Sequence, residues 1–279
     1  MDDKHYEFGK NWRTFIDDYL TDERLVEAQD SLRRFMGKPL RGRTFLDIGC
    51  GSGLFSLAAH RLGAQRVVSF DLDGDSMDCC RELRAREGNP DNWEVLEGSI
   101  LDEAFVTALG EFDVVYSWGV LHHTGEMWQA LENAAQRVRP GGLLYIAIYN
   151  RADGLGLHAD GRVGSSRFWE QEKRLYARLP PWGKRVIDAS AAASMVFGYL
   201  VTARNPFEEI REHKTLRGMS WMVDIRDWLG GHPYEYASVS EVFSFVHDRF
   251  GYSLENLFST NSLRNNEFLF ARPLAPSCF

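Results

Sequence analysis

A glycine-rich loop is the part of the sequence best suited to chemistry. The apolar run 44–48 reads as a buried strand and leads into Gly49-Cys50-Gly51-Ser52-Gly53, and residues 54–62 then carry apolar side chains at helical spacing. A strand, loop and helix in this order present backbone N–H groups at the carboxyl edge of a sheet, where doubly wound folds bind nucleotides. Glycine lets ligand atoms approach the backbone. The alternative is a tight turn that binds nothing.

Two carboxylates accompany this loop. Asp47 stands at the end of the first strand, where a carboxylate can accept from an ammonium group but would repel a pyrophosphate. Asp71 ends the second strand, where a carboxylate can take both hydroxyls of a ribose. Gly53 comes one position earlier than the third glycine of the dinucleotide pattern, and Leu54 occupies that place. An NAD-dependent oxidoreductase is therefore the weakest interpretation.

A pair of histidines, His122 and His123, follows the fourth expected strand. Histidine at this edge can accept a proton near neutral pH, which a hydroxyl, phenol or ammonium nucleophile requires. In the alternative, one histidine holds the loop through a backbone bond while the other faces the cleft or packs. Trp118, just before them, is expected to form a wall of the cleft.

The segment 217–236 is unusually rich in functional side chains, with two Trp, two Tyr, three carboxylates and one His. We expect an aromatic loop that overhangs the cleft and selects the substrate. The specific hypothesis is that a carboxylate orients a polar or cationic group against a tryptophan; the residues concerned are Asp224, Asp227, Glu235, Trp221 and Trp228. The alternative is a small subdomain core with its own ion pairs, such as Arg226 with Asp227 or Glu235.

Two further segments carry polar and aromatic side chains. The stretch 6–12, which includes Trp12, either forms a second flap over the cleft or staples the first helix to the sheet. Asn261, Arg264 and Asn266 stand in the last turn and can reach the cleft, although polar residues in a turn need no functional reason.

The elements that must position these residues alternate along the chain. Strands are expected at 44–48, 66–70, 93–97, 112–116 and 142–149, with helices at 54–62, 75–86 and 127–138 between them. This alternation is typical of a doubly wound α/β fold with a parallel sheet. We divide the chain into a helical lead-in or flap (1–38), a Rossmann-like core (39–150), a substrate-cap insertion (151–237), and a last helix with a terminal hairpin (238–279).

These motifs resemble the class I S-adenosylmethionine (SAM) dependent methyltransferases over residues 43–149. The resemblance implies a mostly parallel seven-stranded sheet of order 3-2-1-4-5-7-6 with strand 7 antiparallel. It also implies that the cofactor, SAM, binds with its methionine moiety over the glycine loop, its ribose on Asp71 and its adenine against Leu72 and Ile100. The cofactor-binding residues implied are Asp47, Gly49, Cys50, Gly51, Gly53, Leu54, Phe55, Asp71, Leu72, Ser99, Ile100, Leu101, Ser117 and Trp118. Ser99 departs from the family, in which many members carry Asp there.

The composition of the chain limits the kinds of partner and cofactor that we expect it to bind. The chain has 279 residues and a formal net charge of −8, and no run of five Lys or Arg occurs, so a nucleic-acid partner is not expected. No run of 18 apolar residues occurs and the N-terminus is charged, so we expect a cytoplasmic protein without a membrane segment or secretory signal. Neither the cysteines nor the acids show ligand spacing, so no metal is expected.

The function expected is SAM-dependent methyl transfer to O or N of a small-molecule metabolite. The alternatives are methylation of a macromolecule, such as a protein or RNA, and a SAM-binding module without turnover. The catalytic candidates are His122, His123 and Asp224, and the substrate-binding candidates are Trp12, Tyr149, Trp221, Asp227, Trp228 and Glu235.

Overall fold

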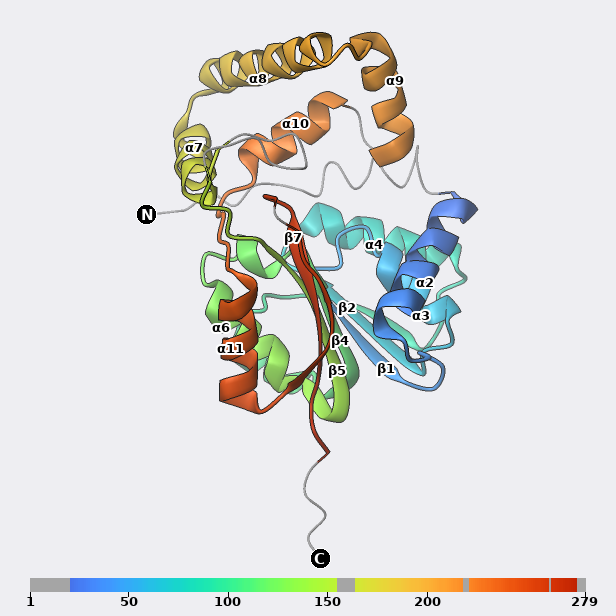
Figure 1. The fold of residues 1–279 in the computed structure, drawn as a ribbon. Helices are drawn as coiled ribbons and strands as arrows, with labels where there is room; N and C mark the ends of the chain where they lie inside the picture. The colour runs from blue at the N-terminus through green and yellow to red at the C-terminus, as the bar shows by residue number, and fades with distance from the viewer. Residues whose placement is uncertain (1–20, 155–163, 218–220, 261, 275–279) are drawn as a thin grey trace, which may run out of the picture.

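A twisted seven-stranded sheet forms the centre of the computed structural model, which describes residues 21–154, 164–217, 221–260 and 262–274 (Figure 1). The strand order is β3-β2-β1-β4-β5-β7-β6, which confirms the expected order. The strands are β1 (Thr44–Ile48), β2 (Arg66–Asp71), β3 (Trp93–Glu97), β4 (Phe112–Trp118), β5 (Val138–Tyr149), β6 (Ser253–Phe258) and β7 (Asn265–Ala271). Strand β7 runs antiparallel to both β5 and β6, and the remaining pairs are parallel.

Helices cover both faces of this sheet (Figure 1). On one face lie α2 (Asp22–Met36), α3 (Leu54–Arg61) and α4 (Gly74–Arg86), with a core around Phe45, Trp93 and Tyr145. On the other lie α5 (Glu103–Ala108), α6 (Met127–Gln136) and α11 (Val239–Phe250), with a core around Phe70 and Phe268. Nearly all side chains of the central strands are buried because both faces are covered, and this explains why their sequences are apolar runs.

The order of the strands reverses at β1. The chain passes from β1 to β2 and β3 on one side and then returns to place β4 on the other, so Asp47 pairs with Ser69 of β2 and with Tyr116 of β4. Ligands of open α/β sheets bind at the carboxyl ends of the strands where such a reversal occurs. The glycine loop is therefore at the position where this architecture binds a ligand.

Four helices lie beyond the carboxyl ends of the parallel strands and form a cap (Figure 1). They are α7 (Ser166–Arg178), α8 (Pro181–Val201), α9 (Pro206–Arg217) and α10 (Trp221–Gly230). The aromatic loop expected at 217–236 is wrong for residues 221–230, which form α10. Periodicity in this short segment was hidden because its apolar residues are interrupted by Asp224, Arg226 and Asp227, which fall between the buried positions Trp221, Ile225 and Leu229.

The cap has its own small core. Trp221, Ile225 and Leu229 of α10 pack with Tyr176 of α7. The Asp227 side chain lies outside the described part of the chain. Arg226 pairs not with Glu235 but with α8: its Nε lies 3.0 Å from Oδ2 of Asp188. The other oxygen of Asp188 accepts from the Tyr176 hydroxyl at 2.7 Å, so this one carboxylate joins three cap helices.

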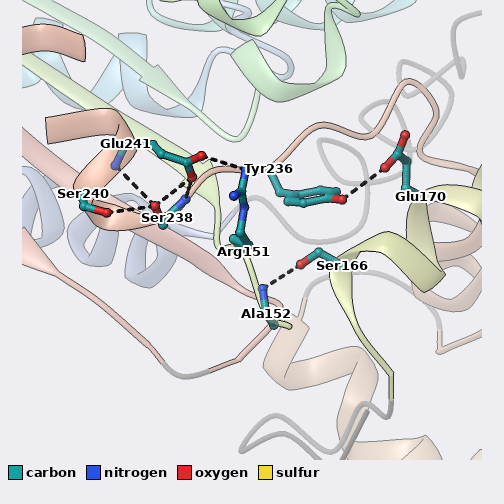
Figure 2. A network of polar contacts seen from close by, with 8 residues as sticks. All are labelled: Arg151, Ala152, Ser166, Glu170, Tyr236, Ser238, Ser240 and Glu241. Atoms are coloured by element: carbon teal, nitrogen blue, oxygen red, sulfur yellow. Dashed lines mark hydrogen bonds and ion pairs between the residues drawn. The ribbon is translucent and has the colours of Figure 1, made fainter. Parts of the chain in front are cut away.

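The cap is attached through two adjacent segments, which we call the neck (residues 150–152 and 236–238). Asn150 and Ala237 form a bridge, and the Ala237 N–H donates to the Tyr149 carbonyl at 3.0 Å. Figure 2 shows Arg151 between its ion-pair partner Glu241, at 2.8 Å, and the ring of Tyr236. The neck thus holds the segment that enters the cap (150–152) beside the segment that leaves it (236–238), at the start of α11.

In the part of the chain that the structure describes, no helix has both the length and the apolar composition needed to span a membrane.

Candidate functional site

The glycine loop is shaped by two positions where no side chain fits. Gly49 has φ of 68°, and a Cβ there would lie 2.4 Å from Val120 Cγ1. Gly53 has φ of 81°, and a Cβ there would lie 2.6 Å from Cys80 Sγ. Both conformations lie in the left-handed region that favours glycine. The loop is therefore pressed against the segment after β4 on one side and against α4 on the other.

Asp71 fixes this loop from the neighbouring strand. Its Oδ2 accepts from the Gly51 N–H at 2.9 Å, and its Oδ1 accepts from the Asp73 N–H at 3.0 Å. Burial is the main reason that the pKa of Asp71 is raised. The two backbone hydrogen bonds lower the pKa but do not cancel the effect of burial. Each carboxylate oxygen retains acceptor capacity for a further donor.

Asp47 is a buried acid beneath the loop. It is 2 % exposed, and its Oδ2 accepts from the Ser56 hydroxyl at 2.5 Å. Burial raises its pKa to about 7, the Ser56 bond lowers it, and the charge of Asp71 raises it further. None of the ion pairs in the described ranges includes Asp47. A cationic group of a ligand would therefore stabilise its charged form.

The remaining residues expected to bind the cofactor fall into three groups. Several are engaged inside the protein: the Ser117 hydroxyl donates to the Ile48 carbonyl at 3.2 Å, and Ser99 Oγ accepts from the Leu101 N–H at 3.2 Å. Others stand at the surface of the sheet edge, where Leu72 is 56 % and Trp118 44 % exposed. Buried or partly buried in the two cores are Cys50, Leu54, Phe55, Ile100 and Leu101. Their contact with a cofactor stays a prediction.

The two histidines both bond to backbone and both contact Tyr149. His122 is fully buried, and its Nδ1 accepts from the Tyr149 N–H at 3.3 Å. Burial, followed by the neighbouring His123 and Lys173, holds its pKa well below the usual range. His123 Nδ1 lies 2.6 Å from the Pro233 carbonyl, so Nδ1 carries the proton of that bond and Nε2 is the acceptor nitrogen of the neutral ring. His123 is thus the better candidate for a proton acceptor.

The expected cap residues do not all face the sheet edge. Trp221 is 7 % exposed inside the cap core. Trp228 lies between cap and core, with its ring centroid 6.0 Å from that of Tyr149 and 4.2 Å from Lys173 Nζ. Both carboxylate oxygens of Glu235 accept from the Met127 N–H, at 3.1 and 3.0 Å, so Glu235 caps the start of α6. This bond gives Glu235 a structural role that its position in a presumed loop did not indicate.

Three candidates have little structural description. Asp224 lies partly buried on α10. Asp227 lies on the same helix, but its side chain is outside the described part, and Trp12 is outside the described residues. Among the side chains that are described, no three His, Cys, Asp or Glu residues form a group that could hold a metal ion.

The sequence interpretation missed two residues at the start of β7, Asn265 and Glu267. Asn265 pairs with Tyr149 of β5, and Glu267 accepts from the Tyr145 hydroxyl at 2.5 Å. The sequence carries no periodic signal for them, because residues 265–270 are three polar residues followed by three apolar ones rather than an alternation. In contrast, Asn266, which was expected in the turn, is buried and bonds to Asn150 at 2.9 Å.

Comparisons with known proteins agree with this architecture. Residues 46–146 match the model of the family described as "Methyltransferase domain". The chain is 36 % identical over 114 residues to a ubiquinone biosynthesis O-methyltransferase of Rhizobium rhizogenes, which covers 41 % of this chain and 44 % of the relative. It is 34 % identical over 128 residues to the protein of the same name from Parvibaculum lavamentivorans, covering 46 % and 48 %. The chain thus matches less than half the length of these two relatives.

Solved structures extend the likeness to the whole fold. Magnesium protoporphyrin IX methyltransferase from Synechocystis PCC 6803 superposes with a TM-score of 0.53 at 14 % identity, covering 94 % of this chain and 93 % of that one. An O-methyltransferase family protein from Burkholderia thailandensis has a TM-score of 0.53 at 17 % identity, covering 91 % and 58 %. Residues 46–146 are therefore similar to a methyltransferase domain, and the chain has the fold of the class I SAM-dependent methyltransferases.

Proposed function

We propose that the chain is a SAM-dependent methyltransferase that methylates an oxygen or nitrogen of a small molecule. The observation that carries this proposal is the pair of acids around the glycine loop at the strand reversal: Asp71 bonded to the Gly51 N–H, and Asp47 buried beneath the loop. The names of the two curated relatives, both O-methyltransferases, support oxygen as the acceptor atom.

The acceptor groups of the loop suit the ammonium and ribose donors of SAM. Asp47 has a pKa raised to about 7 by burial and has no described ion-pair partner, so it can receive the ammonium of a methionine moiety. Asp71 ends β2, where its oxygens can accept from the ribose hydroxyls while still holding the loop. Leu72, which is exposed beside it, offers an apolar surface for the adenine.

The bound cofactor supplies a methyl group on a positively charged sulfur. The residues of the chain have to hold the acceptor in line with that methyl group and exclude water, because charge is lost in the transfer. Trp118 and Tyr149 stand at the ends of β4 and β5 beside the loop and provide surface for this alignment. His123, with Nδ1–H bonded to Pro233, presents Nε2 to accept a proton from a hydroxyl or ammonium group.

A small acceptor is favoured over a macromolecule by the cap. Its four helices lie beyond the carboxyl ends of the parallel strands (Figure 1), the edge at which β1 leads into the glycine loop and β4 ends at Trp118. Its position there suits enclosure of a small molecule. The formal net charge of −8 also disfavours the backbone of a nucleic acid as partner.

A thermal-shift experiment with SAM, S-adenosylhomocysteine (SAH) and NAD tests the cofactor directly. We expect SAM and SAH to raise the melting temperature in proportion to the logarithm of their concentration, and NAD to leave it unchanged. Stabilisation by NAD, without any by SAM or SAH, would overturn the proposal. Transfer of radiolabelled methyl from SAM to a panel of phenols and amines then tests turnover.

A further inference from the structure

The outer side of α8 carries an apolar surface that the proposed methyl-transfer site does not use. Figure 1 shows α8 along the outer edge of the cap, away from the sheet. Its exposed residues include a stripe in which successive members are three or four residues apart, so all of them share one face of the helix. We call this set the outer stripe: Trp182, Val186, Ala189, Ala193, Phe197 and Leu200. Every member is apolar, and every member is exposed.

The opposite side of α8 already has a partner, which makes the outer stripe unusual. Ile187, Ala191 and Tyr199 pack against the core of the cap. A helix that faces solvent on one side normally carries polar side chains there, and a helix that is apolar all round is normally buried on both sides. Trp182 is nevertheless 71 % exposed and Phe197 67 % exposed. The described part of the chain thus covers only one of the two apolar sides of α8.

The exposed apolar area approaches what a stable interface needs. Phe207, in the first turn of α9, is 85 % exposed beyond the C-terminal end of α8. Since an aromatic side chain has about 150–250 Å² of surface, Trp182, Phe197 and Phe207 together expose roughly 450 Å². A stable interface takes about 800 Å² from each partner. Three side chains thus supply about half of that area, and Leu200 and Val201, which are 60 % and 68 % exposed, add to it.

The two ends of α8 have complementary shapes. The N-terminal end carries the large exposed side chain of Trp182. At the C-terminal end, a hollow of about 610 Å³ lies where α8 turns into α9, and its apolar lining includes Leu200, Phe207 and Ile210. Between these ends the outer stripe has only Ala189 and Ala193. A second helix can therefore approach the backbone closely in the middle of α8.

We propose that α8 packs antiparallel against α8 of a second copy of this chain, with Trp182 of each copy in the hollow of the other. When the two helices are centred on Ala191, Trp182 lies opposite Leu200 of the second copy and Ala189 lies opposite Ala193. Large side chains then meet at both ends and small ones in the middle. One surface serves both copies, so the interface is self-complementary and closes as a dimer with two-fold symmetry.

Charge favours a second copy over a lipid surface as the partner. The start of α8 is basic, with Lys184 and Arg185, whereas its end leads into the acidic first turn of α9, with Glu208 and Glu209. An antiparallel pair brings the basic end of each copy toward the acidic end of the other. A membrane with anionic lipids has a negative surface, which would repel this acidic turn and a chain of net charge −8.

Sedimentation velocity of the full chain, in a concentration series up to about 100 μM, measures the dimer. Two variants each remove one half of the contact. Trp182→Ala removes the side chain that enters the hollow, and Leu200→Glu places a charge in the hollow itself. Leu175→Glu is the matched control, because Leu175 is an apolar residue of α7 that is 58 % exposed and lies outside the outer stripe. The melting temperature of each variant shows whether it remains folded.

We expect the wild type and Leu175→Glu to dimerise equally well. Dimers of Trp182→Ala or of Leu200→Glu should be at least about 100-fold weaker, because each symmetric dimer contains the altered contact twice and buried tryptophans dominate many interfaces. A mixture of these two variants should dimerise at least about tenfold more tightly than either alone. The mixed pair keeps one intact contact, between the Trp182 of one copy and the unaltered hollow of the other.

Several results would overturn the inference. They are a wild type that is monomeric at every concentration, a dimer that Trp182→Ala leaves intact, and an equal loss in Leu175→Glu. A mixture that is no tighter than the separate variants would exclude the antiparallel arrangement. Binding of a monomeric wild type to vesicles of phosphatidylcholine and phosphatidylglycerol, lost in Trp182→Ala, would assign the outer stripe to a lipid surface instead.

Discussion

Asp71 Oδ2 lies 2.9 Å from the backbone nitrogen of Gly51, so the acid that ends β2 holds the loop that ends β1. Two neighbouring strands thus depend on one carboxylate for their mutual geometry at the point where the strand order reverses. This single contact joins the fold and the proposed cofactor site.

Replacing this carboxylate should remove most of the cofactor affinity. Asp71→Ala loses the bond to Gly51 and the expected bonds to the ribose, and hydrogen bonds to charged groups contribute about 1.5–3 kcal/mol each. We expect SAH to bind at least about 100-fold more weakly by calorimetry. Asp78→Ala, which removes an exposed acid paired with Arg81 on α4, should leave the affinity unchanged. Asp224→Ala in the cap should also leave it unchanged, and an equal loss in this variant would contradict the division into cofactor floor and substrate cap.

A methyl group at Gly49 should destabilise the protein. Gly49→Ala would place a Cβ 2.4 Å from Val120 Cγ1 at a residue with φ of 68°. We expect the free energy of unfolding to fall by about 2–4 kcal/mol in urea titrations, because the steric overlap and the left-handed backbone both cost energy. Gly74→Ala is the control, since Gly74 opens α4 with nothing within 4 Å of its Cβ position. That variant should be neutral or slightly more stable, and similar losses in both would refute the explanation.

The buried acid Asp47 should make stability depend on pH. Its pKa is about 7 in the folded protein against 3.8 as the reference value, so between about pH 4 and 7 the folded state binds more protons than the unfolded state. The free energy of unfolding therefore falls as pH rises through that window and levels off above pH 7. Asp47→Asn should lessen this slope in urea titrations from pH 4 to 8, while Asp78→Asn should not. Parallel curves for wild type and Asp47→Asn would exclude Asp47 as the source.

Cofactor binding should couple to the same group. An ammonium beside Asp47 favours the ionised carboxylate, so binding below pH 7 should release a proton and the affinity should rise as pH increases to about 7. Calorimetry of SAH at pH 6 in two buffers of different ionisation enthalpy measures the number of protons released. We expect a release that Asp47→Asn abolishes; no release in the wild type would place the ammonium elsewhere.

The cap should be weakened from a single position on α8. Asp188→Ala leaves the Tyr176 hydroxyl without its 2.7 Å bond and removes the 3.0 Å pair with Arg226. A buried polar group left unpaired costs about 1–3 kcal/mol, so hydrogen exchange in α8 and α10 should accelerate while SAH affinity is kept. Glu209→Ala, which breaks the exposed pair with Arg204, should change exchange little. If hydrogen exchange in the glycine loop accelerates together with exchange in α8 and α10, the cap does not open separately from the core, and the prediction is contradicted.

The sequence predicted the sheet well because buried parallel strands have local signatures. Thr44–Ile48 and Phe112–Trp118 are mostly apolar runs that are each followed directly by glycine, and their order follows from the alternation with helices. Helix α10 was missed because its apolar residues repeat over only three turns. Their helical spacing is recognisable only when their packing partners on α7 and α8 are known. Nothing local in the sequence marks Asp188 as the partner of Arg226, because only the tertiary fold brings the two residues together.

Prediction of the site was less complete, for the same reason. Asp47 and Asp71 could be located because each is adjacent to its own strand end, which is a local relationship. Glu267 and Asn265 are far from β4 in sequence and share a face with Trp118 only through the registers of β4 with β5 and of β5 with β7. A shift of one residue in either register would turn both side chains to the opposite face, and the sequence does not specify that register by itself.

The neck formed by residues 150–152 and 236–238 has a consequence for how acceptor preference can change. Since the outgoing and returning segments are bridged at Asn150 and Ala237, the whole cap is a module with adjacent ends. Such a module can be shortened, lengthened or exchanged without disturbing the ladder hydrogen bonds of the sheet. The core can therefore keep its proposed methyl donor while the enclosure over it is replaced, which makes this junction a natural point for grafting caps between proteins.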